Sequence, residues 1–159
     1  MIVGMKDWIE HFRAAANGLA VSHVWRGCGP TLLIEFGALR PPTLTRKDGT
    51  PGEPSGEIGL IIEADWRIED LRAIVCGSSS DDELWEKTFA RLIGKRIIDV
   101  TTFGRLPELL ISLSENLHVA SFSTMEGDPE WTLFDRRGSA EIAVGCWSGV
   151  ITKEPASPA

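Results

Sequence analysis

Two stretches of the chain place hydrophobic residues three and four positions apart, which is the spacing of an amphipathic helix. The first stretch covers residues 3–17, and its apolar positions are Met5, Trp8, Ile9, Phe12 and Ala15 or Ala16. The second covers residues 81–93, and its apolar positions are Leu84, Trp85, Phe89, Leu92 and Ile93. We expect Gly18 and Gly94 to end these helices in the left-handed conformation. Ser80, followed three residues later by a glutamate, is predicted to cap the second helix.

Short runs rich in Val, Ile, Leu and Phe fill most of the remaining sequence. Gly, Pro, Asn and Asp separate these runs, which is the pattern of antiparallel strands joined by turns. The runs after the first helix are 19–25, 31–39, 57–69 and 71–77, and those after the second are 95–103, 108–113, 117–124, 130–135 and 140–148. The polar, proline-containing segment 153–159 is predicted to be a flexible tail.

The second half of the chain repeats the order of features in the first half. The matched pairs are Trp8 with Trp85, Phe12 with Phe89, Gly18 with Gly94, Val21 with Ile97, Val24 with Val100, 32–36 with 109–113, 65–70 with 130–135, and 74–77 with 142–145. We therefore predict an α+β fold of two tandem repeats, 3–77 and 80–150, each a helix followed by antiparallel strands. The repeats are expected to pack about an approximate twofold axis as one β-rich domain, 1–152. The alternative is that two α+β halves share helix-then-strand patterning without duplication.

Composition and charge narrow the classes of function. Hydrophobic residues make up 43% of the chain and charged residues 25%, as in soluble globular proteins, and the apolar runs are too short to cross a bilayer. The formal net charge of -7 argues against binding to nucleic-acid phosphates. The charged residues Lys6 and Asp7 interrupt the N-terminal apolar stretch, which argues against a secretion signal. The three cysteines are widely spaced and odd in number, which argues against a disulfide framework. We predict a cytoplasmic monomer or homodimer that binds neither nucleic acid nor membranes.

No catalytic, cofactor-binding or metal-binding residue is predicted from the sequence. Cys28 lies between two glycines with His23 nearby, but a turn cysteine is the more common use of that position. The serines at 78–80 fit a turn and a helix cap, and the three histidines are isolated, without metal-ligand spacing. Glu63 and Asp65 lie two apart on one predicted strand face, where paired carboxylates could serve as acid and base or form a solvated surface.

The candidate interaction surface is drawn from positions at which the two copies disagree. Four tryptophans fall at matched positions and are expected in the core, whereas Trp25 and Trp147 are unmatched and could each anchor an interface or be buried. The loop 40–56 occurs only in the first half and is functional or mobile, with mobility the simpler expectation. The candidate surface residues are Trp25, Arg26, Cys28, Arg46, Lys47 and Trp147.

A resemblance adds a biological setting to these expectations. The segments "DWRIED", "IVCGSSSDD", "LIGKRIIDV", "LLISLSENLHVASF" and "EWTLFD", within residues 57–135, resemble a group of small uncharacterised bacterial proteins. Some of those proteins are similar to immunity proteins encoded beside bacterial toxins, which implies a cytosolic acidic protein that binds a basic toxin domain. The sequence thus predicts a non-enzymatic binding or protein-interaction module. The alternative is a small-ligand-binding protein or enzyme with its site at the seam between the repeats, where residues such as His23 or Asp99 would converge.

Overall fold

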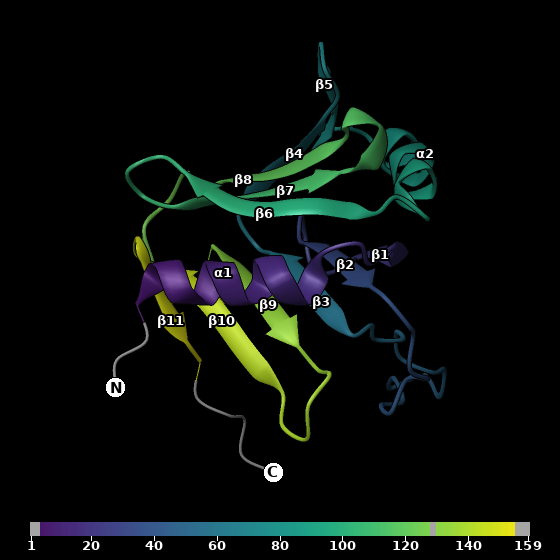
Figure 1. The fold of residues 1–159 in the computed structure, drawn as a ribbon. Helices are drawn as coiled ribbons and strands as arrows, with labels where there is room; N and C mark the ends of the chain where they lie inside the picture. Colours follow the sequence, from purple (N-terminus) through teal and green to yellow (C-terminus); the bar gives the residue numbers. More distant parts are fainter. Residues whose placement is uncertain (1–3, 128–129, 155–159) are drawn as a thin grey trace.

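The computed structural model describes residues 4–127 and 130–154, which form a β-rich α+β fold (Figure 1). All strand pairs are antiparallel, as the sequence predicts. The helices are α1 (Met5–Ala16) and α2 (Asp82–Leu92), with a short 3-10 turn at Ser114–Asn116. The strands are β1 (Val21–Arg26), β2 (Leu32–Phe36), β3 (Ile58–Ile62), β4 (Asp65–Glu69), β5 (Ile74–Gly77), β6 (Ile97–Phe103), β7 (Glu108–Leu113), β8 (His118–Phe122), β9 (Trp131–Asp135), β10 (Ile142–Trp147) and β11 (Val150–Lys153).

The strands form two sheets, and each sheet contains strands from both halves of the chain. The six-stranded sheet has the order β1-β2-β3-β9-β10-β11, and the five-stranded sheet has the order β5-β4-β8-β7-β6. Each sheet therefore contains a three-strand meander from one half and is completed by strands from the other half. The chain passes from sheet to sheet at the β3–β4 and β8–β9 connections, and these two crossings define the seam of the molecule (Figure 1).

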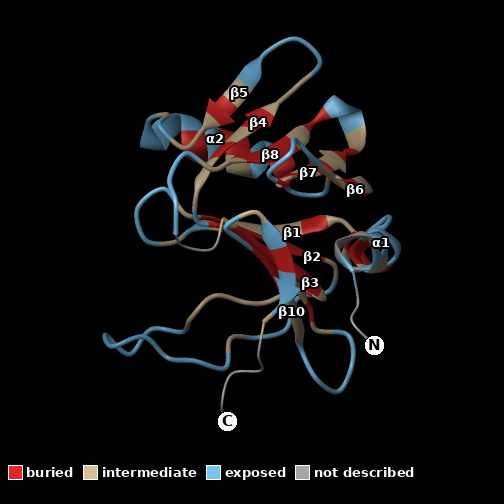
Figure 2. Ribbon diagram, turned by 90° about the vertical axis from the view of Figure 1, so that its left-hand side faces the viewer, coloured by how far each residue is buried: buried red, intermediate tan, exposed pale blue. Residues whose placement is uncertain are grey.

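The two helices lie on opposite sides of the molecule and pack where the sheets face each other (Figure 2). Helix α1 contacts β6, β9 and β11, and α2 contacts β1 and β5. Phe12 of α1 and Leu92 of α2 are fully buried, and Trp85 is 3% exposed. These side chains join the apolar inner faces of both sheets in one buried cluster, so each helix is stabilised mainly by burial of its apolar stripe.

The second helix begins one residue later than the sequence predicts. Its N-cap is Asp81, whose carboxylate accepts a hydrogen bond from Leu84 N at 2.8 Å, and not Ser80. The Ser80 hydroxyl oxygen instead accepts a bond from Gly77 N. The predicted buried face is also too wide, because Leu84 is 37% and Ile93 47% exposed. The buried stripe is centred on Trp85, Thr88, Phe89 and Leu92, and the Thr88 hydroxyl donates to the Leu84 carbonyl.

The segments after the two helices make reciprocal backbone hydrogen bonds. Gly18 N donates to Ile97 O at 2.9 Å, and Gly94 N donates to Val21 O at 2.8 Å. Both glycines have positive φ, 79° and 85°, as predicted for the residue that ends each helix. These bonds join the start of β1 to the start of β6, so the two sheets are tied together beside the helix ends.

Two predicted strand boundaries differ from the structure. The run 57–69, predicted as one strand, is divided between β3 and β4, because the chain leaves one sheet and enters the other at Glu63 and Ala64. Strand β11 was not predicted, and it includes Lys153 from the proposed flexible tail. Glu154 N donates to Ala143 O at 2.8 Å, and the rest of the predicted tail, 155–159, lies outside the described residues.

Candidate binding cleft at the sheet crossings

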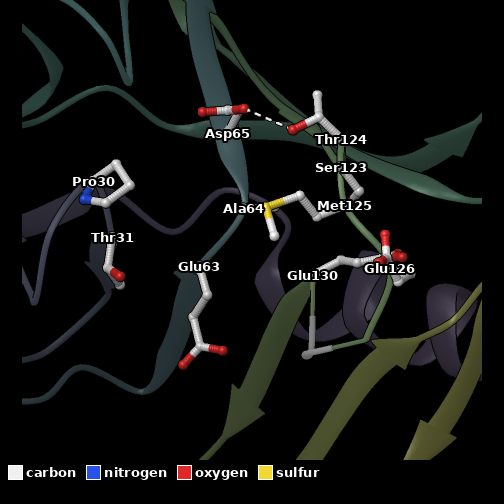
Figure 3. Close-up of a pocket in the computed structure, with 10 residues that line it drawn as sticks. All are labelled: Pro30, Thr31, Glu63, Ala64, Asp65, Ser123, Thr124, Met125, Glu126 and Glu130. Carbon is white, nitrogen blue, oxygen red and sulfur yellow. Dashed lines mark hydrogen bonds between the residues drawn. The ribbon is translucent and has the colours of Figure 1, made fainter.

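A cleft of about 440 Å³ opens at the seam, where three connections come together (Figure 3). One wall comes from the β1–β2 turn at Pro30 and Thr31, and the others come from the β3–β4 and β8–β9 crossings. The side chains that decide its chemistry are the carboxylates Glu63, Asp65, Glu126 and Glu130. Residues from widely separated parts of the chain therefore contribute to one concave site.

Strand register explains why these residues meet. Leu32, Ile62, Trp131 and Cys146 occupy one continuous row of paired positions across the six-stranded sheet. The next position beyond this row is Thr31 before β2, Glu63 after β3, Glu130 before β9 and Trp147 at the end of β10. The row itself is buried, which fixes the ends of the strands, so the residues just beyond it are held at the rim of the sheet.

The lining of the cleft is acidic, and the described residues that form it include no lysine or arginine. Asp65 accepts hydrogen bonds from the Ser78 hydroxyl at 2.9 Å and from the Thr124 hydroxyl at 3.0 Å, and the second of these is drawn in Figure 3. Glu130 accepts a bond from the Cys146 thiol at 3.0 Å. Carboxylates held in this way are acceptors for charge-assisted hydrogen bonds, so the group that suits the cleft best is a cation with several N–H donors.

Cys146 lies directly beneath the cleft but is not an activated nucleophile. Its side chain is buried, and burial together with the neighbouring Glu130 raises the pKa of the thiol to about 12. Because thiolate and not thiol is the reactive species, Cys146 is unreactive at neutral pH. Among the described residues, no three His, Cys, Asp or Glu side chains are arranged to hold a metal ion.

Three of the sequence-predicted surface residues lie on β1 and in the turn after it. Trp25 is half-buried on this edge strand, and its buried indole N–H has no hydrogen-bond partner among the described residues. Arg26 is exposed, but it pairs with Asp82 at 2.5 Å and its guanidinium lies 4.4 Å from the centroid of the Trp85 ring. Cys28 is exposed two residues before Pro30 of the cleft wall. This part of the predicted surface therefore lies close to the cleft in sequence but does not line it.

The other three predicted surface residues are divided between two places. Arg46 and Lys47 are exposed in the loop 40–56, and Arg46 pairs at 2.5 Å with Glu53, which also contacts His23 of β1 at 2.7 Å. Trp147 ends β10, on the far side of β2, β3 and β9 from Trp25. The six predicted residues thus do not gather into one surface, and of the six only Trp147 continues the strand register of the cleft.

Most of the cleft was not predicted as a site. Glu63 and Asp65 were noticed as paired carboxylates, but Glu126 and Glu130 were not, because their proximity depends on the pairing of β3 with β9. A sequence signal was present: an acidic residue directly precedes both Trp66 and Trp131, which are matched positions. His23 and Asp99, considered for a seam site, are not among the lining residues.

Comparison with protein-family models, curated proteins and solved structures finds no match for this chain. Neither helix in the described part of the chain is long and apolar enough to span a membrane.

Proposed function

We propose that this protein is a non-enzymatic interaction module that binds a basic partner protein through the acidic cleft at the seam. One observation carries the proposal: Glu63, Asp65, Glu126 and Glu130 line a single cleft, and no lysine or arginine in residues 4–127 and 130–154 is among its lining residues. The net charge of -7 supports it, because a net negative protein attracts a basic partner over long range and orients it before contact.

The nature of the groups around the cleft favours binding over catalysis. The Cys146 thiol, which donates to Glu130, is protonated at neutral pH, and two hydroxyl donors hold the Asp65 carboxylate in a fixed orientation. We further infer a cytoplasmic, immunity-protein-like role, in which the partner is a basic toxin domain. Three free cysteines, two of them buried, fit a reducing compartment.

A second candidate function is the binding of a small cationic molecule in the same cleft. The volume of about 440 Å³ favours it, because small-ligand sites commonly measure about 300–1,000 Å³. The two candidates differ in what fills the cleft: a protein would insert one or two basic side chains and cover the rim, whereas an amine would bind within the cleft alone.

We also infer that the chain is a tandem repeat, 3–77 and 80–150, packed about an approximate twofold axis. The order of strands supports this, since each half contributes a meander to one sheet and the following strands to the other. Ala20 and Arg96, which follow the two matched glycines by two residues, form a bridge with each other. The register also shifts at equivalent points, between Val21 and His23 on β1 and between Ile97 and Asp99 on β6. An experimental structure in which the halves fail to superpose would contradict this inference.

The cleft proposal is tested with a fluorescently labelled hexa-arginine peptide. The double variant Glu126→Gln/Glu130→Gln should bind it at least about tenfold more weakly than the wild type, because two charge-assisted contacts are lost. The matched control is Glu10→Gln/Glu86→Gln, which removes the same charge from exposed positions of α1 and α2. Equal weakening by both double variants would show that only net charge matters and would refute the cleft as the site. Competition by spermidine as strong as by unlabelled peptide would favour the small-ligand candidate.

A further inference from the structure

An exposed apolar patch borders the acidic cleft. We call it the hairpin patch and define it by Leu106, Trp147 and Val150, whose exposed fractions are 56%, 43% and 58%. Trp147 and Val150 face each other across the β10–β11 hairpin, and Leu106 comes from the β6–β7 turn. The turn and the hairpin touch, because a Cβ placed on Gly149 would lie 3.0 Å from a methyl group of Leu106. Exposed apolar side chains that lie together beside charged residues are a feature of protein interaction sites.

The β6–β7 turn, which contributes Leu106 to the hairpin patch, is held by the core beneath it. The Pro107 carbonyl, next to Leu106, accepts hydrogen bonds from the Trp131 indole N–H at 3.2 Å and from the Cys146 thiol at 3.6 Å. Both donors are buried, so the β6–β7 turn is fixed to the end of the six-stranded sheet. A rigid surface loses little conformational entropy when it binds, which makes its contacts effective.

The hairpin patch and the cleft form one continuous surface through Glu130. Trp131 pairs with Cys146, and Glu130 N donates to Cys146 O at 3.0 Å, so the register places Trp147 beside Glu130. Glu130 is in turn a lining residue of the cleft. A ligand with a basic group in the cleft would therefore place its neighbouring groups over Trp147.

We propose that the hairpin patch is the second half of the docking surface, and that it receives an apolar side chain adjacent to the basic residue that enters the cleft. This inference rests on the proposed function and specifies its partner as a protein segment in which Lys or Arg stands next to Leu, Ile, Val or an aromatic residue. Tryptophan is enriched among the residues that dominate interface energy, and charged neighbours select the partner.

A second copy of this chain is the less favourable occupant of the surface. In a twofold symmetric dimer the same patch meets itself, which would bring Glu126 and Glu130 of one copy close to their equivalents in the other. Each copy also carries a net charge of -7, so self-association would add like-charge repulsion. A partner of opposite charge avoids both costs.

The experiment compares two labelled peptides with equal numbers of arginines, hexa-arginine and a twelve-residue peptide of alternating arginine and leucine. We expect Trp147→Ala to weaken binding of the arginine–leucine peptide about tenfold and to leave hexa-arginine binding unchanged. Val150→Ser should act in the same direction and guards against a folding defect of the first variant. Leu44→Ala is the control, because Leu44 is 79% exposed in the loop 40–56, away from this surface.

The outcomes separate this inference from the proposed function. If the arginine–leucine peptide depends on Glu126 and Glu130 but not on Trp147 or Val150, the cleft stands and the hairpin patch is refuted. If neither peptide binds, the proposed function fails and the inference fails with it. If sedimentation shows a dimer that Trp147→Ala converts to a monomer, the occupant is a second copy and the proposed partner is wrong.

Discussion

Two buried tryptophans at matched positions make the same kind of hydrogen bond, and their replacement gives a sharp test of the fold. The Trp66 indole N–H donates to the Pro30 carbonyl at 2.6 Å, and that of Trp131 donates to the Pro107 carbonyl at 3.2 Å. Each proline stands two residues before a leucine of the strand that follows, so each bond fixes the start of β2 or β7 against a strand from a sheet crossing. Replacement by phenylalanine keeps an aromatic ring and removes the donor.

The loss of stability caused by each replacement depends on the surroundings of the proline carbonyl that loses its indole donor. Pro107 is buried, so Trp131→Phe leaves its carbonyl without water and with only the weak, 3.6 Å hydrogen bond from the Cys146 thiol, at a cost of about 1–3 kcal/mol. The smaller ring also leaves a cavity that costs about 1 kcal/mol. We therefore expect Trp131→Phe to destabilise the protein by about 2–4 kcal/mol. Pro30 is exposed, so water can replace the lost donor, and Trp66→Phe should cost only about 1–2 kcal/mol.

Equilibrium unfolding in urea, followed by far-ultraviolet circular dichroism, measures these differences. Trp147→Phe serves as the reference, because Trp147 is 43% exposed and its replacement should cost less than about 0.5 kcal/mol. The expected order of destabilisation is Trp131, then Trp66, then Trp147. A cost below about 1 kcal/mol for Trp131→Phe, or a cost for Trp66→Phe that equals or exceeds it, would refute the reasoning.

Three further predictions concern acid stability, thiol reactivity and helix ends. The hydrogen bond from the Arg137 side chain lowers the pKa of Asp135 from 3.8 to about 2, which corresponds to about 2 kcal/mol of stability. Since the folded-state pKa is depressed, this stability is present above about pH 4 and lost as the pH falls to about 2, so the gap in unfolding free energy between wild type and Asp135→Asn should close over that range. In the native protein a chromogenic disulfide should label Cys28 alone, and rapid labelling of a second thiol would contradict the burial of the other two. Gly18→Ala and Gly94→Ala should each lower the free energy of unfolding by about 1 kcal/mol, because both positions have positive φ and an added methyl group would gain no contact. Calorimetry measures the effect, and Ala90→Gly, at an exposed site in α2, provides a comparison of known size.

The helices could be predicted closely because their signals are local. The spacing of Trp8, Phe12, Trp85 and Phe89 reports which face is apolar, and this depends only on residues within a few turns. The exact start of α2 could not be predicted, since Ser and Asp are both good N-caps and stand next to each other before the helix. The turn after β5 decides which residue caps the helix, because the Ser80 hydroxyl already accepts a hydrogen bond from Gly77 N.

The partition of strands between two sheets could not be predicted, because it depends on contacts between distant segments. Within the run 57–69, no glycine or proline follows Gly59. The sequence therefore contains no turn signal at the point where the chain leaves β3 and enters the other sheet as β4. For the same reason the cleft could not be predicted, because its carboxylates come from two crossings that are more than fifty residues apart in sequence. Strand pairing, and not local propensity, brings them together.

The contrast between Trp131 and Trp147 indicates how the tandem repeat that we propose would carry a single directional surface. Trp131 corresponds to Trp66 in the first half. Both side chains are buried, and each donates a hydrogen bond from a strand next to a sheet crossing to a proline carbonyl. Trp147 has no match, because the first half lacks an equivalent of the β10–β11 hairpin on which it stands. The crossings from both halves supply the carboxylates of the cleft, whereas the three residues of the hairpin patch beside it all come from the second half. If the twofold axis that we propose relates the two crossings, the cleft alone would accept a cation in either of two orientations, and the hairpin patch on one side would select one of them.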